Sequence, residues 1–297
     1  MDGRQHGRQP LSCPLAMKKT LLALALGTAL SSAFIALPAT AAGELSGANK
    51  VWTYGHNNAG GFLSEIVGFD SATKTLWVAG VGGVDVLDAA SGSFLQRIDT
   101  SAYGSINSLS IHNGIAAFAI ESSTRTAAGV VKLYDTTTRG LASGINSISV
   151  GALPDMLTFT KDGAKLLVAN EGSPLTYGPR LADSGGHRNY GPAAIDPVGS
   201  VSIIDMGSRT VAATATLAGV AQSGSHIRTN TGMDFEPEYI AVNAAGTKAY
   251  VSLQEANAMG VLNLQTGSFD SVIGLGAKDV SAAGNRIDPL NNGTASL

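Results

Sequence analysis

Carboxylates occupy the same position in two copies of a sequence repeat. Residues 154–168 align with residues 237–251 at a constant offset of 83, and the alignment places Asp155 on Glu238. Several carboxylates that converge on one site repel one another unless they are protonated or bridged by a cation. Oxygen ligands of this kind suit Ca2+ or Mg2+ better than Zn2+. The repeat therefore predicts an oxygen-rich cation site.

Further polar side chains extend this pattern. When the turn is shifted by one residue, Glu65 and Asn107 also align with Asp155, and a second set follows the next apolar run of each copy: Glu121, Glu171 and Gln254. The predicted metal ligands are Asp155, Glu171, Glu236, Glu238 and Glu255. The alternative is that each carboxylate accepts backbone N–H bonds and holds neighbouring sheets together. No loop has the Asp-x-Asp-x-Asp-Gly pattern of a calcium loop, so the alignment alone supports the metal.

A second candidate site is the long insertion at residues 172–199, which is rich in Gly and Pro. Loops of this length inside a compact repeat are usually functional or disordered. Two arginines in it are suited to binding an anion. The predicted ligand-binding residues are Arg180, His187, Arg188 and Tyr190. A loop that only covers the surface is the alternative.

The familiar catalytic motifs are missing from the sequence. It has no Gly-x-Ser-x-Gly elbow, no phosphate-binding loop and no pair of histidines at metal-ligand spacing. The only cysteine is Cys13, which lies in the segment expected to be removed, so thiolate and disulfide chemistry are excluded for residues 43–297.

The elements that must position these residues are short strands. Each repeat reads as an apolar alternating run, a glycine turn and a second apolar run, and two more copies begin near Glu65 and Asn107. Third and fourth apolar runs complete each unit, and the third run ends in Asp or Asn before a turn. Four-stranded units of about 40–60 residues are typical of propeller blades. The sequence thus predicts an all-β, WD40-like β-propeller with about four blades, and a β-sandwich is the alternative.

Both ends of the repeat region suggest an incomplete ring. Residues 51–54 are predicted to form a lone strand that would pair with the last blade, whereas residues 286–297 are polar and complete no unit. An open set of blades leaves apolar flanks and unpaired strand edges exposed. We therefore expect residues 43–297 to be one propeller domain that is truncated at its C-terminus.

Residues 1–42 are predicted to be a secretory signal peptide. A basic start at residues 17–19 precedes an apolar stretch at residues 21–37, and small residues follow at 39–42. A membrane anchor is the alternative, but the apolar run is short for a span. Met17 is a better candidate than Met1 for the first translated residue. Residues 1–16 are therefore expected to come from a mis-assigned upstream start. The expected location is periplasmic, extracellular or at the cell surface.

Charge and composition narrow the class of partner. Fifteen basic and twenty-one acidic residues remain after residues 1–42 are removed, for a net charge of −6. An acidic surface argues against nucleic acid and anionic membranes as partners. No membrane span and no sorting signal are visible in residues 43–297.

Several stretches resemble the choice-of-anchor I domain family, which includes relatives of the mesenchyme-specific cell-surface glycoprotein. The similar segments are residues 153–157, 168–172, 196–205, 235–242 and 249–258. The most specific are Asn170-Glu171-Gly172 and the run Glu236-Pro237-Glu238-Tyr239-Ile240-Ala241. The resemblance covers about residues 46–288 and implies a secreted or surface-attached β-propeller. Bacterial members are often labelled alkaline phosphatase-like, so it implies little about activity.

These observations lead to one expected function and two alternatives. The expected function is an exported binding or scaffold module with a Ca2+ or Mg2+ site, whose ligand is a small molecule, a phosphate ester or a surface glycan. A metal-dependent phosphoesterase is the first alternative. The second is another propeller hydrolase such as a sugar lactonase, which fold analogy alone supports.

Overall fold

The computed structural model describes residues 49–56, 62–175, 197–228, 235–282 and 284–287. The chain divides into two compact units, residues 1–51 and 52–297, and all strands belong to the second unit. Every regular element of the described residues is a β-strand. Within those residues, no helix combines the length and the apolar character needed to cross a membrane. The all-β fold class predicted from the sequence is confirmed.

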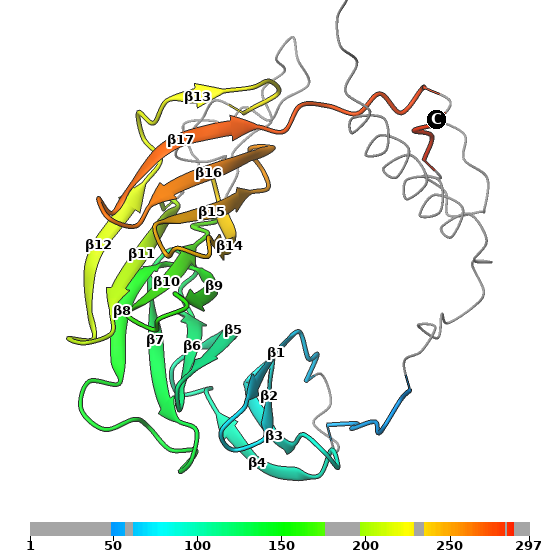
Figure 1. The fold of residues 1–297 in the computed structure, drawn as a ribbon, viewed down its shortest axis with the longest axis vertical. Coiled ribbons are helices and arrows are strands. Elements are labelled where there is room, and N and C mark those ends of the chain that lie inside the picture. Colours follow the sequence, from blue (N-terminus) through cyan, green and yellow to red (C-terminus); the bar gives the residue numbers. More distant parts are fainter. Residues whose placement is uncertain (1–48, 57–61, 176–196, 229–234, 283, 288–297) are drawn as a thin grey trace, which may run out of the picture. The chain divides into compact units, whose positions relative to one another are not determined.

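The second unit contains four antiparallel sheets in chain order, and each contains four consecutive strands (Figure 1). The first sheet contains β1 (Ile66–Asp70), β2 (Thr75–Gly80), β3 (Gly83–Asp88) and β4 (Phe94–Asp99). The second contains β5 (Ser105–His112), β6 (Ile115–Glu121), β7 (Ala128–Asp135) and β8 (Ser147–Ala152). Each predicted repeat unit therefore forms one sheet.

The third and fourth sheets repeat this order. The third contains β9 (Pro154–Phe159), β10 (Lys165–Asn170), β11 (Ser200–Asp205) and β12 (Thr210–Thr216). The fourth contains β14 (Pro237–Val242), β15 (Lys248–Leu253), β16 (Ala258–Asn263) and β17 (Ser268–Gly274). A short fifth strand, β13 (Gln222–Ser223), joins the fourth sheet by pairing in parallel with β17. The sequence did not predict β13, because a two-residue strand carries no periodic pattern.

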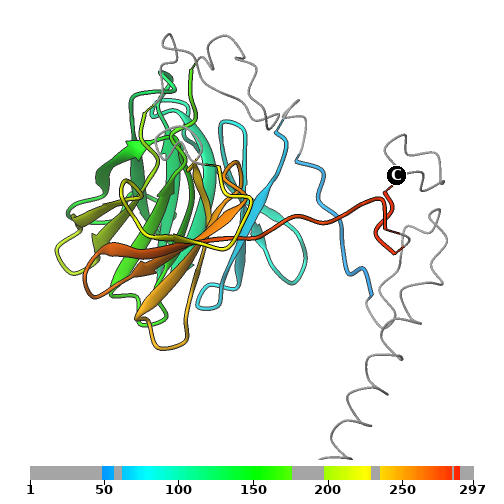
Figure 2. The same cartoon turned by 90° about the horizontal axis from the view of Figure 1, so that it is seen from above.

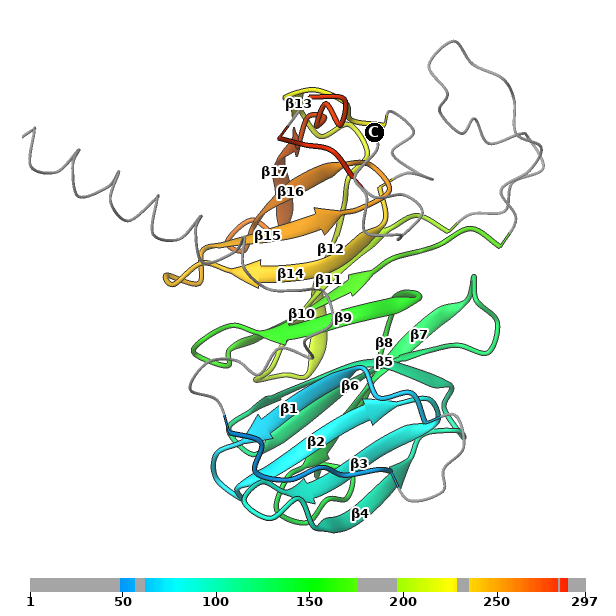
Figure 3. The same cartoon turned by 90° about the vertical axis from the view of Figure 1, so that its right-hand side faces the viewer.

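The first strands of the four sheets lie side by side. β1 contacts β5, β5 contacts β9, and β9 contacts β14. Figures 1 and 2 show the sheets following one another in chain order, and Figure 3 shows β1, β5, β9 and β14 on the same side of the unit. Residues at equivalent places in these strands are therefore brought near one another.

The hydrophobic core fills the spaces between neighbouring sheets. Because strand side chains alternate between faces, β10 sends Leu166 and Val168 toward the second sheet and Leu167 and Ala169 toward the fourth. Between the first two sheets, Trp77 packs against Phe118 with ring centroids 6.1 Å apart. The third sheet is thus buried on both faces.

The predicted strand at residues 51–54 is not present. The segment instead binds the first sheet through side chains: Trp52 Nε1 donates to the Ala89 carbonyl at 3.2 Å, and its ring lies against Gly92. His56 Nδ1 lies 2.8 Å from Asp85 Oδ2, and Asp85 is fully buried. The alternating residues at 51–54 resemble a strand, but these side-chain contacts hold the segment without a strand ladder.

The Asp or Asn that ends each third strand closes the turn that follows. Asp88 Oδ1 accepts from the Ser91 amide at 2.8 Å, Asp135 Oδ1 from the Thr138 amide at 2.7 Å, and Asp205 Oδ1 from the Ser208 amide at 2.8 Å. In the fourth sheet Asn263 Oδ1 accepts from the Gln265 amide at 3.0 Å. The repeated residue is therefore an acceptor that starts the turn.

Replacing Asp205 with alanine should lower the melting temperature by a few degrees, because the Ser208 amide and hydroxyl lose their acceptor. Asp205→Asn should lose much less, since the amide oxygen can accept the same bonds as in Asn263. Thermal unfolding followed by circular dichroism distinguishes the two. Equal losses would show that the charge, and not the acceptor, stabilises the turn.

Candidate functional site

A β-bulge lies at the aligned polar position in three of the four first strands. In the ladder between β9 and β10, Met156 opposes Ala169 and Pro154 opposes Asn170, so Asp155 is the extra residue. In the ladder between β5 and β6, Asn107 likewise has no opposing residue. In the ladder between β14 and β15, Glu238 lies in the bulge. Bulges redirect side chains out of the regular alternation of a strand. The repeat therefore repeats a local backbone feature as well as a residue type.

The ends of the second strands carry the other carboxylates to the same edge. Because each hairpin is antiparallel, the start of the first strand pairs with the end of the second: Ser105 opposes Glu121, and Pro237 opposes Leu253, two residues before Glu255. The Glu171 amide donates to the Leu153 carbonyl at 2.8 Å, which holds Glu171 beside the start of β9. The two sets of acids in the sequence thus meet.

We call Asp155, Glu171, Glu236, Glu238 and Glu255 the acidic cluster. Its most closely joined pair is Glu171 and Glu236, which share Ser173. Ser173 Oγ contacts Glu171 Oε1 and lies 3.2 Å from Glu236 Oε2. One hydroxyl has one proton to donate. Both contacts can be hydrogen bonds only when one carboxyl is protonated and donates a proton of its own.

The pKa values of three members of the acidic cluster are raised. Burial raises the pKa of Asp155 to about 6, with Glu171, Glu65 and Glu121 adding repulsion. Burial and the charges of Glu255, Asp155 and Glu171 raise the pKa of Glu238 to about 7.

Glu236 is the most strongly affected member of the acidic cluster. Burial raises its pKa to about 8, and the charges of Glu255 and Glu171 add to this effect. No lysine or arginine of the described residues is among the causes that act on these three carboxyls. Like charges and burial therefore raise these three pKa values, and no positive side chain among these causes opposes them.

Buried oxygens in this region are left without partners. Glu236 is 2% exposed, and its Oε1 has no hydrogen-bond partner in the described structure; Glu255 Oε2 is in the same situation. A buried acceptor without a partner costs free energy unless an unseen group satisfies it. These oxygens are therefore acceptors that a proton, a water or a cation would satisfy.

The structural alternative, in which the acids hold sheets together through backbone N–H bonds, finds no support among the described residues. The side-chain hydrogen bonds of the acidic cluster there involve the Ser173 hydroxyl and the side chains of Glu171 and Glu236. Neighbouring sheets are tied instead by Asn107, whose Nδ2 donates to the Pro154 carbonyl at 3.1 Å. The Asn107 amide therefore joins the second and third sheets.

The structure describes the predicted metal ligands but not the predicted ligand-binding loop. The acidic cluster consists of the five predicted metal ligands, and within the described ranges no three His, Cys, Asp or Glu side chains are already arranged to hold a metal. That they bind a cation stays a prediction. The predicted ligand-binding residues Arg180, His187, Arg188 and Tyr190 lie outside the described residues.

Sequence reasoning missed Ser173. It lies two residues after Glu171 but contacts Glu236, 63 positions further along the chain. No spacing within one repeat reveals this contact, because it joins the third sheet's loop to the residue before β14. The nearest signal was the short distance in sequence between Glu171 and a small hydroxyl residue.

Comparisons with known proteins identify a family and include distant structural likenesses. A search of curated proteins found no match to this sequence. Among solved structures, hydrazine synthase of Kuenenia stuttgartiensis is 14% identical with a TM-score of 0.40, over 68% of this chain and 65% of that one. The chain thus spans less than two thirds of that protein's length. The family model of the choice-of-anchor I domain matches residues 65–297, and the chain belongs to this family.

Proposed function

We propose that this chain is an exported β-propeller module that binds Ca2+ or Mg2+ at its acidic cluster. Membership in the choice-of-anchor family indicates a surface-associated protein. Export by the N-terminal signal peptide, the propeller architecture and the cation belong to the proposal. The cation would recruit a small anionic ligand such as a phosphate ester or a surface glycan.

The arrangement of the sheets supports the propeller. Four sheets of four antiparallel strands follow one another, and their first strands are neighbours. Blades of a propeller have this order, with the first strand of each nearest the common axis. On this frame the acidic cluster faces the axis, where a ligand can reach residues from more than one blade.

One observation carries the cation proposal: Glu171 and Glu236, both in contact with Ser173, lie beside further carboxylates, and no lysine or arginine of the described residues is among the causes that shift the pKa of Glu236. Oxygen-only surroundings suit Ca2+ and Mg2+. Because the described side chains form no ready-made cage, a bound ion would draw the carboxylates together and complete its shell with water. The protein ligands of the ion would be the carboxylates of Glu171, Glu236, Glu238, Glu255 and Asp155.

Calorimetric titration of the purified, chelator-treated chain with CaCl2 and MgCl2 tests the proposal. Binding should raise the melting temperature, since the ion binds the native state alone. Glu171→Gln should weaken Ca2+ binding by at least about tenfold, which corresponds to about 1.4 kcal/mol. The matched control is Asp270→Asn, which removes an exposed acid that pairs with Lys248. Equal affinities in both variants would contradict the proposal.

Hydrolysis of a phosphate ester remains the alternative activity. A metal-dependent hydrolase needs an activated water or nucleophile beside the ion. The same proteins should therefore be assayed with a chromogenic phosphate ester and with a sugar lactone. Turnover that requires the cation and disappears in Glu171→Gln would replace the binding module with an enzyme.

A further inference from the structure

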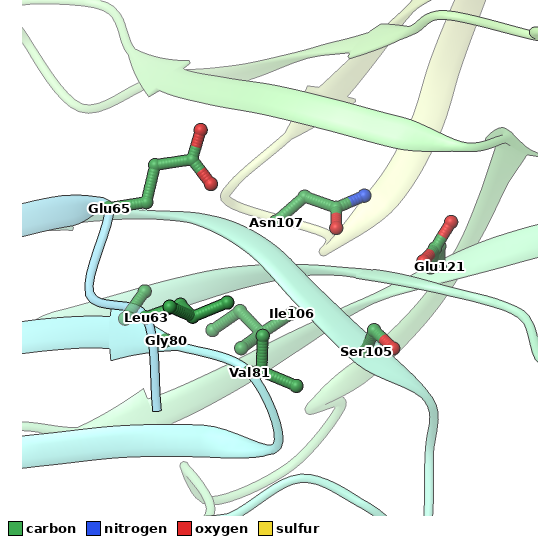
Figure 4. A pocket seen from close by; sticks show the side chains of 9 residues that line it. Leu63, Glu65, Gly80, Val81, Ser105, Ile106, Asn107 and Glu121 are labelled. Carbon is green, nitrogen blue, oxygen red and sulfur yellow. The ribbon is translucent and has the colours of Figure 1, made fainter. Parts of the chain in front are cut away.

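A pocket of about 200 Å3 lies between the first and second sheets, and none of the five residues of the acidic cluster lines it. It is bounded by the residues before β1, the end of β2, the start of β5 and the end of β6. Figure 4 shows Glu65, Asn107 and Glu121 along one side and Leu63, Val81 and Ile106 along the other. The pocket therefore has one polar and one apolar side.

The polar side offers acceptors. Glu65 and Glu121 contribute carboxylates, and Asn107 presents its amide oxygen, because its Nδ2 is committed to the Pro154 carbonyl at 3.1 Å. Among the described residues, no lysine, arginine or histidine lines the pocket. Burial raises the pKa of Glu121, and the nearby Arg125 offsets this effect only in part while Glu171 adds repulsion. A ligand that donates hydrogen bonds and carries positive charge matches this side.

The apolar side and the size of the pocket restrict the ligand further. A volume of about 200 Å3 exceeds the roughly 30 Å3 that one water occupies, and it is below the roughly 300 Å3 of the smallest drug-sized sites. A bare metal ion would leave the apolar wall of Leu63, Val81 and Ile106 unused. A short alkyl chain next to a charged group would use both sides.

We infer that this pocket binds the ammonium end of a short aliphatic amine. Glu121 would pair with the ammonium, the Asn107 amide oxygen would accept one of its protons, and the apolar side would cover the methylene groups. Glu65, at the other end of the polar side, would add negative charge that favours a cation. A free amine and a lysine side chain on a partner protein share this chemistry. The inference does not depend on a cation at the acidic cluster.

Binding of n-butylamine to the full chain, followed by chemical-shift changes in NMR spectra, tests the inference. We expect a dissociation constant in the low millimolar range, as for other ligands of so few atoms. Neutral 1-butanol should bind at least about tenfold more weakly, and so should n-butylamine to Glu121→Gln. Glu65→Gln, which changes an exposed residue and carries little folding risk, should also weaken binding.

A second ligand and a control variant distinguish the possible explanations of amine binding. A blocked lysine tripeptide that binds as tightly as n-butylamine assigns the pocket to a partner's side chain, and a much weaker tripeptide assigns it to free amines. Glu255→Gln is the matched control, because it changes the acidic cluster without lining the pocket. The Glu255→Gln variant should bind n-butylamine as the wild type does. If this variant loses Ca2+ binding, that result bears on the proposed cation site and not on the amine pocket. Equal binding of amine and alcohol, or unchanged binding in both pocket variants, would overturn the inference.

Discussion

Glu236→Gln is expected to stabilise the chelator-treated protein at about pH 8.5 by an amount of the order of 3 kcal/mol. The wild-type carboxyl is buried beside Glu171 and Glu255, and these surroundings raise its pKa to about 8. A glutamine imitates the protonated form: its oxygen can accept from Ser173 and its amide can donate to Glu171. The variant therefore keeps the contacts and removes the charge.

The sign of the pH dependence follows from the direction of the shifts. The pKa values of Asp155, Glu238 and Glu236 are raised to about 6, about 7 and about 8, so folding takes up protons. The stability that these three groups contribute should be fully present below their unfolded pKa values, near pH 4, and should be lost as the pH rises through 6 to 8. Urea unfolding at several pH values, without divalent ions, measures this.

Matched measurements decide what the acidic cluster contributes. Glu236→Gln should flatten the fall between about pH 6 and 8.5, whereas Asp270→Asn should follow the wild type. Calcium should recover part of the stability that the wild type loses at high pH, and much less in Glu236→Gln. A wild-type stability that rises with pH across this range would refute the clustering of charge described above.

Trp77→Ala is the second large effect, and we expect it to lower the free energy of unfolding by about 3–5 kcal/mol. Trp77 is fully buried between the first two sheets, against Phe118. Its Nε1 donates to Thr75 Oγ1 at 2.9 Å, so the substitution also removes a buried hydrogen bond. Urea unfolding followed by circular dichroism gives the difference.

Trp52→Ala is the control for this prediction. Trp52 is only partly buried and lies across the outer part of the first sheet, so its loss should cost clearly less. Trp77→Phe keeps most of the ring and provides a milder variant if Trp77→Ala does not fold. A loss at Trp52 as large as that at Trp77 would mean that the core between the first two sheets is not the main source of stability.

The strands were predictable because their signals are local. Each unit shows the alternation of apolar residues that marks a strand and the Asp or Asn that precedes a turn. Four units repeat both signals. The bulges were not predictable, since the extra residue at Asp155 becomes visible only when β9 and β10 are paired. Residues 51–54 alternate as the residues of a strand do, but they pair with no other strand in the described ladders. A local pattern therefore predicted a strand that pairing does not form.

The candidate site was predictable in its residue types and not in its geometry. Alignment of the repeats brought Asp155 and Glu238 to one position, and the hairpin register explains why Glu171 lies near them. The contact of Ser173 with Glu236 depends on how two sheets pack, which no repeat encodes. The pocket between Glu65 and Glu121 likewise exists only where two sheets meet.

The short strand β13 has a consequence for self-association. Sheet edges offer unpaired backbone groups to any other chain and are starting points for aggregation. Residues before the fourth sheet return to its outer strand: Gln222 pairs with Val272, and the Val272 amide donates to the Ala221 carbonyl at 2.9 Å. The protein therefore occupies part of this edge with its own backbone, which lowers the chance that β17 recruits a strand from another molecule.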